Sequence, residues 1–261
     1  MNPLFRLLSR LLAVLLVSAL QVACLDADQG LSLKTDWGSI ESDGNVVQLK
    51  VDQTPDGGRR NLPRLNNRMK EVRVAGMPDM KPQLKPEIDH WVISLPKGAK
   101  APLVVELETI EPVRYCEEAY VVKQTDAKQL LLPAHHAETH SQMLRFEPQP
   151  HKNTIGYWVK PADWAEWQME VTAGGRYAIE VLQGCGKNQG GSEVDIVVVN
   201  AAGKKQVVPF VIEDTGHFQN FKPRVIGKLE LEPGKYALQV RPTKLANKAI
   251  GDIRQIKLLA Q

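Results

Sequence analysis

The chain has 261 residues, of which 43% are hydrophobic and 24% charged, a composition typical of a folded globular protein and not of a disordered or collagen-like one. Its 33 basic residues nearly balance its 30 acidic residues, and no dense basic patch predicts nucleic acid as a partner. A (β/α)₈ barrel alone takes about 250 residues, so the length excludes a barrel enzyme with accessory domains.

The N-terminus has the pattern of an export signal. Residues 1–27 combine Arg6 and Arg10 with a short apolar run at 11–17, and small residues follow. We expect a secretory signal peptide and a secreted or periplasmic protein. Cys24 ends a sequence similar to a lipoprotein signal, so a lipid anchor at Cys24 is the alternative. No later segment is apolar enough to predict a transmembrane span.

The rest of the chain has the pattern of an all-β protein, because short apolar runs alternate with turn sequences. In 164–171, for example, every second residue is apolar, as expected for a strand with one buried face. The predicted strands cover 46–51, 72–74, 90–95 and 103–107, and then 164–171, 177–181, 194–199, 207–212, 226–231, 236–240 and 253–259. A polar segment near 123–128 separates the two sets. We therefore predict two β-sandwich domains, at 28–124 and 128–261.

Several motifs in the second set are similar to those of a known family. They are 155–158 (IGYW), 163–167 (DWAEW), 175–177 (GRY), 182–186 (LQGCG), 190–194 (GGSEV), 214–218 (DTGHF) and 233–236 (PGKY). In this order they resemble a carbohydrate-binding module of the family 6/35 type, over essentially all of 128–261. The likeness is strongest to the modules at the C-terminal end of secreted bacterial α-L-fucosidase-like proteins. It implies a jelly-roll, galactose-binding-like sandwich.

The first domain has a weaker resemblance. Its motifs are 44–47 (GNVV), 62–67 (LPRLNN), 72–76 (VRVAG) and 93–96 (ISLP). They are similar to the small β-sandwich that follows the catalytic barrel in family-29 glycoside hydrolases. The chain thus resembles the two accessory domains of a fucosidase-like protein without the barrel, which implies a protein that is not an enzyme.

The resemblance also implies a sugar site built from aromatic and amide side chains on loops of the second domain. At the matching positions stand Tyr157, His217, Phe218 and Asn247, which are the predicted carbohydrate-binding residues. Aromatic faces stack on sugar rings, and amides pair with hydroxyl groups. His217 and Phe218 stand where the family more often has tryptophan.

The tryptophans of the second domain have a simpler interpretation. Trp158, Trp164 and Trp167 are expected to lie in the sandwich core, where large aromatic side chains usually pack.

A metal site has weak support. On a strand, His136, Glu138 and His140 would share one face and could hold a metal ion, although polar strand-edge residues are the simpler interpretation. Modules of the resembled type often carry a structural calcium ion. Here the stretch 134–137 (AHHA) has histidines where acidic residues are usual, and Asp252 lies near the last strand. We expect no cofactor, with a structural calcium ion as the alternative.

Two cysteines remain outside the predicted signal. In an exported protein, Cys116 and Cys185 could form a disulfide, although their spacing in the sequence does not show whether they meet.

Together these features predict an exported, non-catalytic carbohydrate-binding protein. Its expected partner is a glycan or polysaccharide, and a glycoside hydrolase is a further candidate partner. The alternatives are a structural or interaction protein of the cell envelope, and a remnant or accessory subunit of an α-L-fucosidase-like glycoside hydrolase. A small sandwich-fold enzyme that cleaves glycans is a further alternative, although no nucleophile or nucleotide motif is present.

Overall fold

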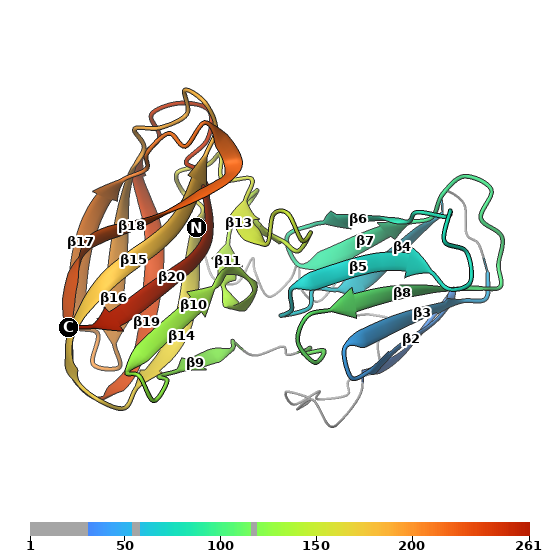
Figure 1. Cartoon of the computed structure of the whole chain (residues 1–261), viewed down its shortest axis with the longest axis horizontal. Coiled ribbons are helices and arrows are strands. Elements are labelled where there is room, and N and C mark those ends of the chain that lie inside the picture. The colour runs from blue at the N-terminus through green and yellow to red at the C-terminus, as the bar shows by residue number, and fades with distance from the viewer. Residues whose placement is uncertain (1–30, 54–57, 116–118) are drawn as a thin grey trace, which may run out of the picture.

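The computed structural model describes residues 31–53, 58–115 and 119–261. The predicted signal, Cys24 and Cys116 lie outside these ranges. The described residues form 20 strands and one 3₁₀ turn, η1 (Ala134–His136), so the predicted all-β sandwich fold is confirmed. The strands gather in two lobes that lie side by side along the long axis of the molecule (Figure 1). No helix in the described ranges is long and apolar enough to cross a membrane.

The first lobe consists of two antiparallel sheets that enclose a core. The five-stranded sheet has the order β1 (Ser32–Thr35), β2 (Gly38–Asp43), β3 (Val46–Val51), β8 (Leu103–Thr109) and β5 (Met69–Val74). The three-stranded sheet has the order β4 (Arg59–Pro63), β7 (His90–Ser94) and β6 (Gln83–Pro86). Every second residue of β3 and β8 is buried, as the alternation of the sequence requires. Trp91 of β7 lies fully in this core.

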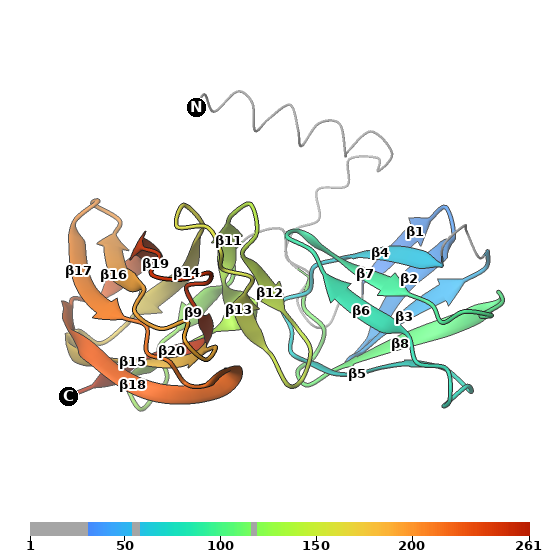
Figure 2. The same cartoon turned by 90° about the horizontal axis from the view of Figure 1, so that it is seen from above.

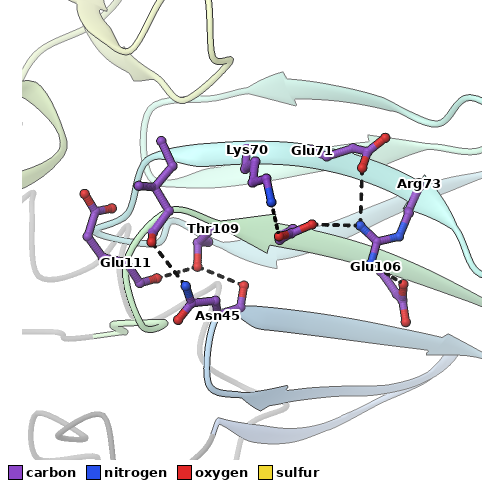
Figure 3. Close-up of polar contacts among 9 residues, drawn as sticks. Asn45, Lys70, Glu71, Arg73, Glu106, Thr109 and Glu111 are labelled. Carbon is purple, nitrogen blue, oxygen red and sulfur yellow. Dashed lines mark hydrogen bonds and ion pairs between the residues drawn. The ribbon is translucent and has the colours of Figure 1, made fainter.

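The outer face of this lobe carries a network of ion pairs between β5 and β8 (Figure 3). Lys70 Nζ lies 2.6 Å from Glu108 Oε1, and Arg73 contacts Glu108 and Glu106 at 3.0 and 2.9 Å. Such exposed pairs contribute little each to stability, roughly 0–1 kcal/mol. They keep the solvent face of the strand pair polar.

The second lobe consists of two six-stranded sheets. One has the order β12 (Arg145–Glu147), β13 (Thr154–Gly156), β20 (Asp252–Ala260), β15 (Gly175–Cys185) and β18 (His217–Leu231), with β10 (Gln129–Pro133) also paired to β20. The other has the order β11 (Glu138–His140), β14 (Trp164–Val171), β19 (Gly234–Lys244), β16 (Glu193–Asn200) and β17 (Lys205–Val211), with β9 (Val121–Lys123) also paired to β14.

The tryptophans of this lobe have two different environments. Trp158 and Trp167 are fully buried, as predicted, and their indole Nε1 atoms donate to Asp163 O at 2.9 Å and to Pro133 O at 2.7 Å. Trp164 is only half-buried, and it lies on the outer face of β14 together with Glu166, Gln168 and Glu170. The prediction of a core position is therefore wrong for Trp164, because it belongs to the polar side of the alternating strand.

Two strands differ from the prediction, one in the lobe to which it belongs and the other in the residue at which it begins. β9 pairs in parallel with β14, so residues 121–123 extend a sheet of the second lobe although the pattern groups them with the first. β18 begins at His217, nine residues before the predicted start at 226, because its N-terminal part is polar and lacks a clear alternation.

The two lobes meet through β12, which Figure 2 shows on the side of the second lobe that faces the first. The buried Arg145 donates to Pro86 O at 3.1 Å and pairs with Glu87 at 2.9 Å, both in the first lobe. Next to it, the ring of Phe146 lies 6.4 Å from the ring of Trp91. Polar and apolar contacts thus join the lobes at one seam.

Candidate functional site

A pocket of about 690 Å³ lies at one end of the second lobe. Its walls come from the segments after β13 and β15, the start of β18 and the segment before β20. The residues that line it include Glu147, Lys152, Tyr157, His217, Phe218 and Asp252. We call it the end pocket. Three of the four predicted sugar-binding residues, Tyr157, His217 and Phe218, line it.

Tyr157 follows directly after β13 and is held in an unusual backbone conformation. Its φ is 58°, in the left-handed region that residues other than glycine rarely adopt. The side chain is 45% exposed, and the guanidinium carbon of Arg145 lies 4.3 Å from the ring centroid. The Nζ of Lys152 lies 5.7 Å from the same centroid. The side chains of Arg145 and Lys152 therefore make cation–π contacts with the Tyr157 ring. The strained backbone of Tyr157 is of a kind that is often found at functional sites.

Phe218 reaches the end pocket because the end of β15 lacks side chains that would block it. His217 pairs with Cys185 across β15 and β18. A Cβ on Gly186 would lie 2.6 Å from the ring of Phe218, and a Cβ on Gly184 would collide with its carbonyl oxygen. We predicted His217 and Phe218 on a loop, whereas they are the first two residues of a strand.

The floor of the end pocket carries two carboxylates that the sequence analysis did not assign to the sugar site. Glu147 is 4% exposed and Asp252 is 5% exposed. Gly156 leaves room for them, because a Cβ there would collide with Glu147 Oε2 and lie 3.1 Å from Asp252 Oδ1. Lys152 forms an ion pair with Glu147. Within the described residues no hydrogen bond is formed to the carboxylate of Asp252, whose charged neighbours are Glu147, Lys152 and Arg254.

The electrostatics of the floor follow from this burial. Burial, together with the negative charge of Glu147, raises the pKa of Asp252 well above its ordinary value, while Lys152 and Arg254 act in the opposite direction. Glu147 and Asp252 are thus two acceptors in a poorly hydrated place, and only one of them has a lysine partner.

Asn247 has a different position from the other three predicted residues. It is exposed, and its side-chain nitrogen donates to Gly190 O at 2.8 Å. Its neighbour Lys248 lines the end pocket, but Asn247 does not. In this arrangement Asn247 ties two surface segments together.

The three candidate metal ligands, His136, Glu138 and His140, do not all share one strand face. His136 lies in η1 and stacks on Tyr120 with 3.7 Å between ring centroids, so it does not share a strand face with Glu138 and His140. Burial, followed by the nearby His135, lowers the pKa of His136 to about 3. Glu138 and His140 do share a face of β11, and they lie close to Glu166 of β14.

Two further expectations concern Asp252 and the cysteines. The calcium expectation named Asp252 and the histidines of 134–137. Asp252 lines the end pocket. His135 is buried. Cys185 is buried, and burial raises the pKa of its thiol to about 11. Its predicted partner Cys116 lies outside the described residues, so the disulfide stays a prediction.

Neither a protein-family model nor a curated protein sequence matches this chain. Among solved structures, an α-L-fucosidase from Vibrio sp. strain EJY3 is similar over 88% of this chain and 40% of its own, with 16% identity and a TM-score of 0.35. The chain thus spans less than half the length of that fucosidase.

Two isolated modules are similar to about half of the chain. The C-terminal family 6 carbohydrate-binding module of a marine laminarinase from Zobellia galactanivorans is 17% identical over 50% of this chain and 98% of its own, with a TM-score of 0.41. A family 35 carbohydrate-binding module from Clostridium thermocellum is 16% identical over 52% of this chain and 100% of its own, with a TM-score of 0.40.

Proposed function

We propose that this chain is a carbohydrate-binding protein and that the end pocket holds a sugar residue. The observation that carries the proposal is the meeting of aromatic walls and an acidic floor. Tyr157 follows β13 and Phe218 lies on β18, and the buried carboxylates of Glu147 and Asp252 line the same pocket. The motif resemblance to carbohydrate-binding modules supports the same function.

The chemistry of a sugar fits this combination of groups. The C–H faces of a sugar ring pack on aromatic side chains, while its hydroxyl groups donate to carboxylate oxygens. Asp252 lines the pocket and offers carboxylate oxygens that can accept from a sugar hydroxyl group. The volume of about 690 Å³ is also in the range of small-ligand sites.

The wider role that we propose is an exported protein that binds glycans without cleaving them. It would hold itself, or a partner glycoside hydrolase, close to a polysaccharide. Support comes from the signal-like residues 1–27 and from the absence of a catalytic motif in the sequence. The fucosidase-like accessory role rests on the motif resemblance.

A glycan array tests the binding proposal. The protein is screened beside a Tyr157→Ala/Phe218→Ala variant and a Val207→Ala control, whose exposed valine lies on β17 and does not line the end pocket. We expect the wild type and the control to bind the same glycans and the double variant to lose them. Equal binding by all three proteins, or no binding by any, would contradict the proposal.

The non-catalytic part needs a separate measurement. Chromogenic fucosides and the best array glycan are incubated with the wild type and with Asp252→Asn. We expect no turnover by either protein. Turnover by the wild type that disappears in Asp252→Asn would instead indicate a glycosidase that uses the two floor carboxylates.

A further inference from the structure

A second cluster of chemically active side chains lies on the second lobe, apart from the end pocket. Glu138 and His140 are on β11, and Glu166 is on β14 directly opposite Glu138. One ligand atom from each of the three side chains lies within 4.8 Å of the other two. All three residues are half-buried, and none of them lines the end pocket.

The two carboxylates of this cluster are unfavourably placed unless a cation is present. Like charges directly opposite each other on paired strands are destabilising. Neither Glu138 nor Glu166 forms an ion pair with any described residue. The two carboxylates therefore face each other across the strand pair without a direct ion-pair partner among the described residues.

Two arginines beside the cluster, Arg64 and Arg241, have other partners. Arg64 donates to Ala137 O at 2.6 Å. The negative charge of Glu138 is close enough to act on the pKa of Arg64. Arg241 donates to Gln239 Oε1 at 2.7 Å and lies over the ring of Trp164 at 3.7 Å. These contacts position the two cations beside the cluster without pairing them to its carboxylates.

The side chains of the cluster are held in place by their neighbours. Gln168 and Gln239 each donate to one oxygen of Glu166 at 2.7 Å. The ring of His140 stacks on Trp164 with 3.8 Å between centroids and an angle of 8°. Ligands of a metal ion need such supporting contacts, which fix the orientation of the coordinating atoms.

We propose that Glu138, His140 and Glu166 bind a divalent transition-metal ion, with Zn²⁺ as the best fit. Zn²⁺ takes imidazole nitrogen and carboxylate oxygen at about 2.0–2.2 Å, and three protein ligands leave a fourth position for water or a ligand. Ca²⁺ needs six to eight oxygen ligands, which two carboxylates and a histidine do not supply. The positive charge of the ion offsets the repulsion between the two glutamates. This proposal does not depend on sugar binding in the end pocket.

Calorimetric titration of the full chain with Zn²⁺ alone tests the site. His140→Phe removes the ligand but keeps an aromatic ring to stack on Trp164, and Glu166→Gln removes the charge at nearly constant volume. Glu170→Gln is the matched control, because Glu170 lies on the same face of β14 and outside the cluster. We expect one Zn²⁺ per wild-type chain, affinity at least about tenfold lower in each ligand variant, and no change in the control.

A second readout separates this site from other surface histidines. Co²⁺ bound by one nitrogen and two carboxylates at a four-coordinate site gives visible absorption bands, which we expect in the wild type and not in His140→Phe. Absence of stoichiometric binding in the wild type would overturn the proposal. So would Zn²⁺ affinity and Co²⁺ bands that are unchanged in both ligand variants.

Discussion

At the scale of single residues, Tyr157 connects backbone strain to the end pocket. Its φ of 58° costs roughly 1–2 kcal/mol for a residue with a Cβ, and glycine avoids that cost. Tyr157→Gly and Tyr157→Ala both lose the ring and its contact with Arg145. We therefore expect Tyr157→Gly to be more stable than Tyr157→Ala by about 1 kcal/mol in urea unfolding, and both to bind sugar weakly. Equal stability of the two variants would show that the strain is absent.

Asp252 predicts a particular dependence of stability on pH. Its pKa is raised in the folded state, above the ordinary value of 3.8, so the folded protein holds this proton more tightly than the unfolded chain does. The resulting stabilisation is fully present below pH 3.8 and is lost as the pH rises through the folded pKa. Asp252→Asn carries no such proton. We expect the variant to gain stability relative to the wild type as the pH rises, and to be the more stable protein at neutral pH.

Urea unfolding of both proteins from pH 3 to pH 8 measures this difference. Glu180→Gln serves as the control, because Glu180 is half-buried on the neighbouring strand β15 and pairs with Lys257. A gap between wild type and Asp252→Asn that stays constant with pH would contradict the assignment of a raised pKa to Asp252.

At the scale of secondary structure, the pairing of β15 with β18 sets the shape of the end pocket. Gly186→Ala brings a Cβ to 2.6 Å from the ring of Phe218, so the ring has to move. We expect this change to lower sugar affinity in the wild type and to have little further effect in a Phe218→Leu background, where the side chain is smaller. A double-mutant cycle by calorimetry measures the coupling, and additive effects would contradict it.

Gly184, which lies within β15 two residues before Gly186, gives the contrasting case. A Cβ there would collide with the carbonyl oxygen of Phe218, which belongs to the backbone and moves less easily than a ring. We expect Gly184→Ala to destabilise the fold by roughly 1–3 kcal/mol, as overpacking of a close contact usually does. Thermal unfolding measures the loss. A stability within about 0.5 kcal/mol of the wild type would contradict the close approach of the two strands.

The strands themselves illustrate what the sequence could predict. β3 and β14 match their predicted bounds because one face of each is buried and the other polar, which makes the period of two visible. β12 and β13 were not predicted. Each has only three residues, and all three are buried, so no alternation marks them. Short fully buried strands take their structure from neighbours that are distant in the sequence.

The same reason explains the incomplete prediction of the end pocket. Tyr157 and Phe218 could be proposed from aromatic motifs. Glu147 could not be assigned to the site, because it lies on β12 and meets Asp252 of β20 only after the sheet has formed. For Asn247, the sequence does not distinguish a sugar-binding amide from one that donates to a backbone carbonyl. The hydrogen bond to Gly190 O depends on the fold, which brings the two residues together. Groups that one local motif supplies can be proposed from the sequence, whereas groups that meet only after two strands have paired cannot.

At the scale of the whole molecule, the seam through Arg145 predicts how the lobes unfold. Arg145→Met removes the hydrogen bond to Pro86 and the ion pair with Glu87. We expect a loss of about 1–3 kcal/mol and separate unfolding transitions for the two lobes, where the wild type shows one. Arg73→Met is the control, since its ion pairs are exposed on β5 and β8 and should matter by less than about 1 kcal/mol. A single transition at the wild-type temperature in Arg145→Met would show that the seam does not couple the lobes.

The central claim is that a sugar binds in the end pocket, and chemical-shift mapping by NMR tests it most directly. The full chain is titrated with the best glycan from the array. We predict saturable shifts at Tyr157, His217 and Phe218, and none at Trp164 on the outer face of β14. Shifts confined to other surfaces, or no saturable shift with any glycan, would contradict the claim.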